Sequence, residues 1–178
     1  MRGPLSRSTG DGTWFEDFPV GRKMRHARGA TVDEVENNYI SKQVMNTAQA
    51  HWNEHYLQGA PGSSRGASQS SSTFSLLGSG RVVFGLITAS MVIGLSSQDT
   101  AENALAEVGL DKLKFIAPVH HGDTLYAYTE VLAASDAPGR KDAGIVTFKH
   151  WGLTHDGRLV FEGERTVLIK KRSHWIEK

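Results

Sequence analysis

Hydrophobic positions divide this 178-residue chain into a helical first half and a strand-rich second half. The longest apolar run covers residues 82–95, and from Leu86 to Leu95 it is apolar on nearly every side of a helix. The run is shorter than the roughly 20 residues that a helix needs to cross a bilayer. It therefore predicts a helix buried at the centre of the fold.

A second helix is predicted before this run. Thr31 and Glu34 have the spacing of a capping box, with Thr31 as the first residue of the pair. Hydrophobic residues then recur at helical spacing at positions Val32, Val35, Tyr39 and Ile40. The helix would lead the chain into the stretch NTAQAHWNEHY, residues 46–56.

Four later segments have the composition of strands: residues 110–119, 123–134, 144–154 and 158–171. In the last segment Leu159, Phe161, Val167 and Ile169 alternate with Glu162 and Glu164, as in a sheet with one wet face. Asp156-Gly157 is a tight-turn signal, so the last two strands should form an antiparallel hairpin. A helix followed by an antiparallel meander predicts an α+β fold.

Two polar regions flank this pattern. Residues 1–12 are expected to form a flexible leader, and residues 173–178 a tail, around a single domain from 13 to 172. Residues 59–80 are rich in glycine and serine and bury little apolar surface. This insertion is interpreted either as inert or as a mobile lid.

Charge and composition exclude several classes of function. The formal net charge is +1, and no basic run alternates with aromatic residues, so neither nucleic acid nor a membrane is an expected partner. The chain has no cysteine, which excludes thiol chemistry and fits a reducing compartment. The N-terminus lacks the apolar core of a secretory signal, so a cytoplasmic location is expected.

Two stretches resemble a known family. The sequence GRVVFGLITASMVIGL at 80–95, followed by LDKLKFIAPVHHGDTLYAYTEV at 110–131, is similar to the MaoC-like dehydratases, the R-specific enoyl-CoA hydratase branch of the hot dog superfamily. Members show a PV-x-x-GDTL phrase, which the chain matches at Pro118, Val119, Gly122, Asp123, Thr124 and Leu125. The resemblance implies a curved antiparallel sheet wrapped around a long central helix, in a homodimer or larger homo-oligomer.

The resemblance also implies a site. The family's catalytic aspartate and histidine stand five positions apart in a phrase like D-x-N-P-x-H, which places the histidine at His51 and the aspartate at Asn46. Phe84 stands where the family usually has histidine before Gly85. His51 is then the candidate acid/base, and Asn46 either positions the substrate or only closes a turn.

The start of the central helix would hold the thioester oxygen. Gly85 lets main-chain amides approach a ligand, or serves only tight packing, and Ser90 matches a serine of the family's helix phrase. Leu86, Arg81 and Glu54 are assigned to substrate binding, with Glu54 a possible substitute for the missing carboxylate. No cofactor is expected, because the CoA is part of the substrate.

The stretch HWNEH at 51–55 also fits H-x-x-E-H, in which two histidines on one helical face bind zinc. Chance matches to so short a pattern are common. His120 and His121 are interpreted as part of a turn rather than a metal pair, since neighbours on an extended chain point to opposite sides.

The predicted function is hydration of a 2-enoyl-CoA, or the reverse dehydration. Departures from the family phrase favour a short branched dicarboxylic acyl group, as in mesaconyl-CoA or itaconyl-CoA. The alternatives are a hot dog thioesterase and a non-catalytic acyl-CoA-binding subunit.

Overall fold

One antiparallel sheet of five strands and one long helix make up most of the structure. The computed structural model describes residue 5 and residues 12–57 and 80–176. The strands are β1 (Lys23–Thr31), β2 (Ala104–Phe115), β3 (Thr124–Asp136), β4 (Ala143–Thr154) and β5 (Leu159–Lys170), in the order β1-β3-β4-β5-β2. The helices are α1 (Glu34–Gln43), α2 (Glu54–Leu57), α4 (Gly85–Thr100) and α5 (Arg172–Trp175), with short 3₁₀ turns η1 (Phe15–Asp17) and η2 (Gln49–His51).

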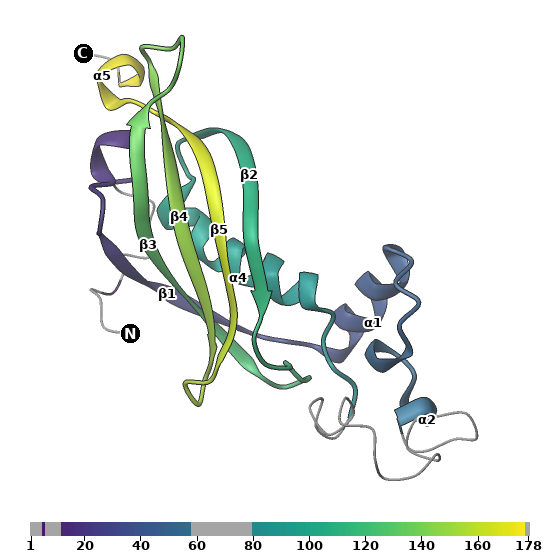
Figure 1. The fold of residues 1–178 in the computed structure, drawn as a ribbon. Coiled ribbons are helices and arrows are strands. Elements are labelled where there is room, and N and C mark those ends of the chain that lie inside the picture. The colour runs from purple at the N-terminus through teal and green to yellow at the C-terminus, as the bar shows by residue number, and fades with distance from the viewer. Residues whose placement is uncertain (1–4, 6–11, 58–79, 177–178) are drawn as a thin grey trace.

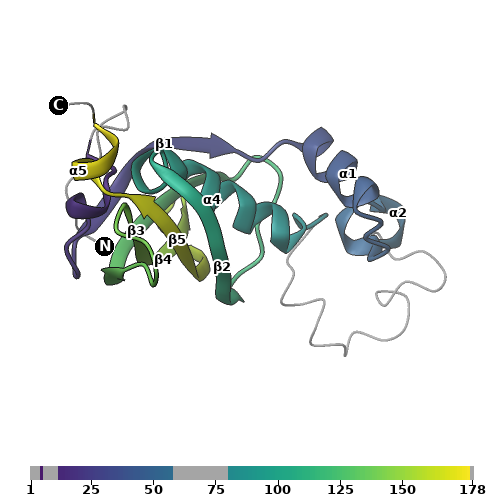
Figure 2. The ribbon, with the colours of Figure 1, turned by 90° about the horizontal axis from the view of Figure 1, so that it is seen from above.

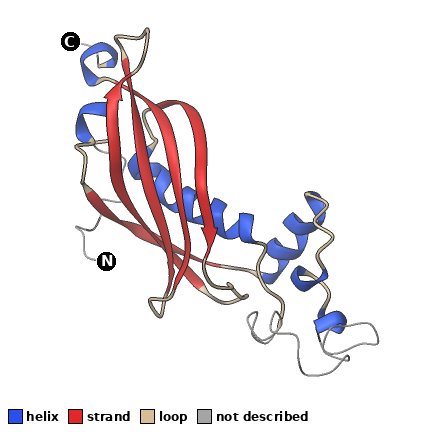
Figure 3. Ribbon diagram, viewed as in Figure 1, coloured by secondary structure: helices blue, strands red, loops and turns tan. Residues whose placement is uncertain are grey.

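The sheet bends around α4, as Figures 1 and 2 show, while α1 and α2 lie beyond the N-terminal end of α4. Figure 3 separates the two kinds of structure: strands in one curved sheet, and helices along its inner face and at both ends. The expected α+β class and the curved antiparallel sheet around a central helix are confirmed.

Helix α4 packs closely on the sheet because small residues allow it. Val92 is fully buried, and a Cβ added at Gly152 of β4 would lie 2.4 Å from Val92 Cγ2. Any side chain at position 152 would clash with the buried side chain of Val92. This close approach is what a buried apolar helix with small neighbours requires.

The helix is longer than the apolar run that predicted it. It continues past Leu95 to Thr100, where the pattern alone suggested a polar connection. Three hydroxyls bond back to main-chain carbonyls of the preceding turn: Ser96 and Ser97 donate to Ile93, and Thr100 donates to Ser96. Each polar side chain is thereby satisfied inside the helix, so these residues are compatible with burial.

The expected start and face of α1 are wrong. Asp33, not Thr31, caps the helix: its Oδ1 accepts a hydrogen bond of 2.7 Å from the amide of Val35. Thr31 instead ends β1, and its hydroxyl contacts that of Thr124 at 2.8 Å. Val35 is 71% exposed and Tyr39 is 62% exposed. The helix turns Asn37 inward, and the side-chain amide of Asn37 forms hydrogen bonds with the neighbouring segments.

Strand β1 was not predicted from the sequence. Only Met24 and His26 of its nine residues point into the core, and its register with β3 shifts between Arg25 and Gly29. Two inward residues and an irregularity leave no clear alternation for a pattern search to find.

The hairpin and the alternation at the end of the chain are confirmed. Gly157 has φ 85°, and its amide donates to the carbonyl of Thr154 at 2.9 Å, closing the turn between β4 and β5. Along β5, Phe161 and Ile169 are buried, while Glu162 lies on the opposite, partly open side. Arg165 is the inward residue that the pattern did not suggest.

The leader, apart from residue 5 and residue 12, and the 59–80 insertion, apart from residue 80, lie outside the described residues. At the other end α5 is part of the structure, since the indole of Trp175 donates to the carbonyl of Asp142 at 3.0 Å. No helix within residues 12–57 and 80–176 has the length and apolarity needed to cross a membrane.

Candidate active site

His51 and the segment before α4 lie side by side. The amide of Val82 donates to the carbonyl of Ala50 at 3.1 Å, and the ring Nδ1 of His51 lies 3.0 Å from the carbonyl oxygen of Val82. The two segments are about thirty positions apart in sequence, so their meeting is a product of the fold.

The contact with Val82 fixes the chemistry of the His51 ring. A carbonyl oxygen only accepts, so the hydrogen of a neutral imidazole lies on Nδ1. The other nitrogen, Nε2, then keeps its lone pair and can take a proton. The ring of Phe84 lies 5.5 Å from the His51 ring, centre to centre. His51 is thus oriented on one edge and available as a base on the other.

The ring of His51 lines an open cavity of about 710 Å³. The other walls come from the segment before α4, the first turn of α4, the end of β2 and the segment that follows it, and β5. They are Val82, Val83, Phe84, Gly85, Leu86, Thr88, Phe115, Ile116, Ala117, Pro118, Val119 and Val160. The lining is almost wholly apolar, which suits an acyl chain.

Gly85 and Leu86, at the start of α4, line the same cavity. Within the part of the chain that the structure describes, the amides of Gly85 and Leu86 have no hydrogen-bond acceptor, whereas that of Ile87 donates to the carbonyl of Phe84 at 2.8 Å. Free amides at a helix N-terminus stabilise negative charge. They form a candidate oxyanion site across the cavity from His51.

Gly85 also serves packing. A Cβ added at this residue would lie 3.0 Å from the ring of Phe115, which is closer than a side chain tolerates without movement. Phe115 belongs to the lining of the cavity. The structure thus supports the packing interpretation of this glycine, and its role toward a ligand stays a prediction.

Asn46 and Ser90 line a second cavity. This cavity, of about 750 Å³, shares Phe84 and Leu86 with the first and does not include His51. The Oδ1 of Asn46 accepts a hydrogen bond of 3.0 Å from the amide of Ala48, so the side chain closes a turn. Ser90 is exposed on the outer side of α4. Leu86 lines both cavities.

Arg81 and Glu54 are placed differently from their predicted role. Arg81 donates from Nε to Glu54 at 3.1 Å, from Nη1 to Asn38 at 3.2 Å, and from Nη2 to Glu34. The hydrogen bond to Glu34 is the main cause that raises the pKa of Arg81, and Arg81 in turn lowers the pKa of Glu34. The guanidinium ties α1 and α2 to the segment before α4, and neither Arg81 nor Glu54 lines either cavity.

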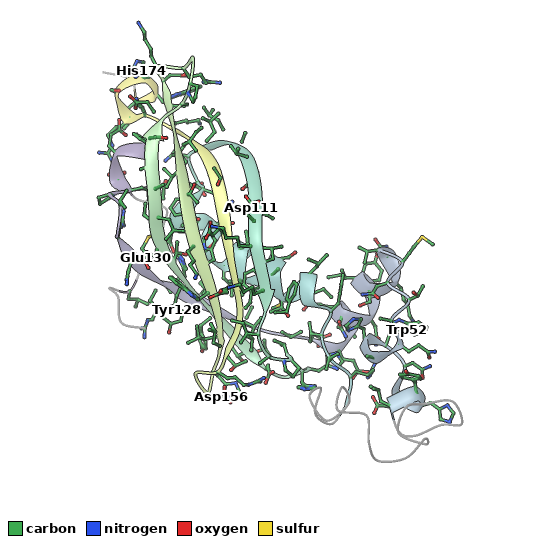
Figure 4. The ribbon with its side chains drawn as sticks, viewed as in Figure 1. Trp52, Asp111, Tyr128, Glu130, Asp156 and His174 are labelled. Carbon is green, nitrogen blue, oxygen red and sulfur yellow. The ribbon has the colours of Figure 1, made fainter. Side chains whose placement is uncertain are left out.

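The zinc interpretation required His51 and His55 on one helical face. The helical structure is interrupted between them: η2 ends at His51, and α2 begins only at Glu54. Figure 4 shows Trp52 at this break, at the end of the molecule that carries α1. Among the described residues no group of three metal-ligating side chains comes together. The prediction of a shared helical face is wrong.

Sequence reasoning missed Asn37, which lies at the centre of the site. It is fully buried, although the pattern placed no functional residue on α1. Its amide reaches His51, the segment before α4, and His121. The only sequence signal was a polar pair, Asn37 and Ser41, at helical spacing where burial would require partners.

His120 and His121 lie in a turn, as expected, and face different partners. Nδ1 of His120 contacts the carbonyl of Arg81 at 3.2 Å, while Nε2 of His121 contacts Asn37 at 3.0 Å.

A curved antiparallel sheet around a central helix, with a histidine and helix-start amides around one apolar cavity, defines a MaoC-like protein of the hot dog fold. Solved structures share this fold. The chain is similar to a putative MaoC domain protein dehydratase from Chloroflexus aurantiacus, with a TM-score of 0.71 and 24% identity over 94% of this chain and 43% of that one. It is also similar to a MaoC-like dehydratase from Rhodospirillum rubrum, with a TM-score of 0.69 and 23% identity over 90% of this chain and 99% of that one.

The family model described as mesaconyl-CoA hydratase matches residues 24–171, and the chain belongs to this family. Among its relatives are a beta-methylmalyl-CoA dehydratase from Chloroflexus aurantiacus, 30% identical over 89% of this chain, and a mesaconyl-CoA hydratase from Haloarcula marismortui, 29% identical over 90% of it. The chain spans less than half the length of these relatives, 44% of the first and 43% of the second.

Proposed function

We propose that the chain forms the site of an acyl-CoA hydratase or dehydratase, which adds water across the double bond of a 2-enoyl-CoA or removes it again. The observation that carries the proposal is the shared cavity of His51 and the free amides of Gly85 and Leu86. Family membership agrees with it, since the relatives are named for this chemistry.

The reaction assigns one task to each side of the cavity. Nε2 of His51 takes a proton from water as the water oxygen bonds to C3 of the enoyl group. The electron pair moves to the thioester oxygen, which the amides of Gly85 and Leu86 hold as an enolate. A proton returns to C2 and completes the addition. The protonated ring of His51 is the donor that this site offers, because Asn46 has no acidic proton.

The proposed substrate is a methyl-branched acyl-CoA such as mesaconyl-CoA. The names of the relatives favour it over itaconyl-CoA and over a straight chain. The apolar walls of the two adjoining cavities offer a surface for a methyl branch on either side of Leu86. The proposal includes no cofactor and a cytoplasmic location.

A test compares crotonyl-, mesaconyl- and itaconyl-CoA with the purified chain, following both the loss of enoyl absorbance and the release of free thiol. The proposal expects hydration without thiol, fastest with mesaconyl-CoA. Thiol release would instead identify a thioesterase. Binding of the thioesters with neither reaction would identify a non-catalytic acyl-CoA-binding subunit.

We further propose that the chain works as a homodimer or larger homo-oligomer. Large apolar side chains are exposed on edge strand β2 and the segment after it, where Val108 is 56% exposed and Leu110 is 51% exposed. Another exposed group lies on α1 and the turn after it, where Met45 is 84% exposed. Apolar surface of this kind is typical of a subunit interface.

A further inference from the structure

The side chain of Asn37 joins the two halves of the candidate site. Its Nδ2 donates to the carbonyl of His51 at 2.8 Å, and its Oδ1 accepts from the amide of Phe84 at 3.0 Å. The carbonyl of Val82, which holds the His51 ring, also lies 3.4 Å from Nδ2. One buried amide thus contacts the main chain of the base and the main chain of the oxyanion segment.

The contact with Phe84 selects which amides remain free. The amide of Phe84 is bound to Asn37, so the next amides along the chain, those of Gly85 and Leu86, are the ones left for a ligand. Without Asn37 the Val83–Phe84 peptide, which directly precedes the peptide that carries the Gly85 amide, would lose its hydrogen bond to a side chain. The donors that would face the thioester oxygen therefore depend on a residue that does not line the cavity.

The second hydrogen of Nδ2 points to His121. Nε2 of His121 lies 3.0 Å from Nδ2, and an amide nitrogen only donates, so Nε2 must carry a lone pair and no hydrogen. A protonated His121 would bring two donors together. Turning the amide of Asn37 around would not help, because its nitrogen would then face the amide of Phe84. The network as a whole requires a neutral His121.

Resting on the proposed function, we propose that Asn37 is a positioning residue that sets His51 and the oxyanion amides relative to each other, and that its hold depends on the neutral form of His121. Asn37 touches no reacting atom. Its effect passes through the backbone of His51 and of residues 82–84.

The surroundings of His121 support the neutral form. Partial burial is the main cause that lowers the pKa of His121. The nearby charges of Arg81 and His120 lower it further, and the charges of Glu34 and Asp33 oppose this effect. The ring is therefore neutral at pH 7, where the network is intact.

Two variants separate positioning from mere support of the fold. Asn37→Asp keeps an oxygen for the amide of Phe84 but gives up both donors, so its second oxygen faces the carbonyl of His51 and the lone pair of His121. Protonation of His121 would relieve the second of these two repulsions, because the ring would then donate to the carboxylate. The matched control is Asn38→Asp, the same change one residue along α1, where the side chain accepts a hydrogen bond from Arg81 and has no hydrogen bond to His51, Phe84 or His121.

The direct test needs no enzyme activity. In ¹⁵N-histidine NMR spectra of the wild-type chain, His121 and His51 should both show the Nδ1–H tautomer, and the pKa of His121 should lie below the usual value of about 6.5. In Asn37→Asp the pKa of His121 should rise above that value, because a carboxylate replaces the donor. An unchanged tautomer and pKa of His121 in this variant would overturn the proposal.

Activity gives the second readout. At pH 7.5, Asn37→Asp should hydrate mesaconyl-CoA about 100-fold more slowly than the wild type, a loss typical of a misplaced catalytic group. The ratio of variant to wild-type rate should increase as the pH falls and His121 becomes protonated, whereas Asn38→Asp should show a constant ratio. A constant ratio for Asn37→Asp would mean that Asn37 only supports the fold.

If Asn37→Asp does not fold, substitutions at His121 carry the test. His121→Ala should slow hydration, and His121→Gln should recover part of that loss, because its amide oxygen can accept from Nδ2 of Asn37 at every pH. Equal loss in both would overturn the proposal. If the NMR result holds but the wild-type chain hydrates no thioester, the proposed function fails while the positioning network stands.

Discussion

At the scale of single residues, the site depends on which atoms of each side chain are already hydrogen-bonded and which are free for a substrate. Nδ1 of His51 donates to the carbonyl of Val82, which leaves the lone pair of Nε2 available, while Oδ1 of Asn46 accepts from the amide of Ala48. The two positions that the family phrase pairs are thus in different states: one is available for chemistry and the other is engaged in a turn.

This difference predicts the effect of restoring a carboxylate. Asn46→Asp should fold normally, because a carboxylate oxygen can accept from Ala48 as the amide oxygen does. Its rate with crotonyl-CoA should change by less than about tenfold, a barrier change under about 1.4 kcal/mol. The check is a steady-state comparison with the wild type. A larger gain would show that position 46 reaches the reacting carbon.

Much of this residue-level arrangement could not be predicted from sequence. The phrases at 80–95 and 118–125 identified a family, because their residue types and spacing are specific, and the spacing of the family's catalytic phrase made His51 the candidate base. Nothing in the sequence indicated that Arg81 and Glu54 would form an ion pair with each other. Contacts between segments about thirty positions apart depend on the fold, and Asn37 is buried for the same reason.

At the scale of elements, a chain of buried polar groups connects α4 with three strands. Asp99 of α4 contacts Nδ1 of His26 at 2.7 Å, Nε2 of His26 contacts the hydroxyl of Thr129 at 2.7 Å, and that hydroxyl contacts Nδ1 of His150 at 2.8 Å. With both rings neutral every contact has one donor and one acceptor. Only Nε2 of His150 is left without a partner, as a bare lone pair.

Burial is the main cause that lowers the pKa of His150 well below its usual value, and it also lowers that of His26, against the opposing effect of Asp99. A histidine whose pKa is lower in the folded state than in the unfolded chain contributes its full stability at a pH above the unfolded pKa of about 6.5. This contribution is lost as the pH falls below that value, because the unfolded chain then takes up the proton. The free energy of unfolding should therefore decrease below pH 6.5, by up to about 1.4 kcal/mol per pH unit for each proton taken up on unfolding.

Urea unfolding between pH 7.5 and pH 5 measures this dependence. His150→Phe removes one of the titrating groups and leaves the contact between His26 and Thr129, so its free energy of unfolding should vary less with pH. An equally steep dependence in the variant would show that His150 is not a source of it.

The elements themselves were largely predictable where the hydrophobic pattern is regular. The central helix, the last hairpin and the later strands follow from apolar runs and from Asp156-Gly157. Strand β1 did not, because only Met24 and His26 point inward. The inward face of α1 was also predicted wrongly, since the pattern counts apolar residues and this helix buries Asn37 and Ser41 instead.

At the scale of the whole molecule, the exposed apolar side chains predict self-association. Replacing Val108 and Leu110 by arginine places two charges on edge strand β2, where an apolar interface would have to bury them. Light scattering coupled to size-exclusion chromatography should show the mass of the oligomer for the wild type and that of a monomer for the double variant.

The matched control is Val20→Arg, an exposed valine in the turn before β1 that is 64% exposed. This variant should keep the mass of the wild type. A monomeric wild type, or an oligomer that survives the two arginines on β2, would contradict the assignment of this edge.

The account as a whole rests on His51 acting as the base of a thioester hydratase. The most direct measurement is the rate of mesaconyl-CoA hydration by His51→Ala beside His55→Ala, which removes an exposed histidine four positions later that lines neither cavity. We expect His51→Ala to lose about two to four orders of magnitude in turnover, as when a general base is removed, while His55→Ala keeps the wild-type rate. Equal rates in the wild type and in His51→Ala would contradict the account.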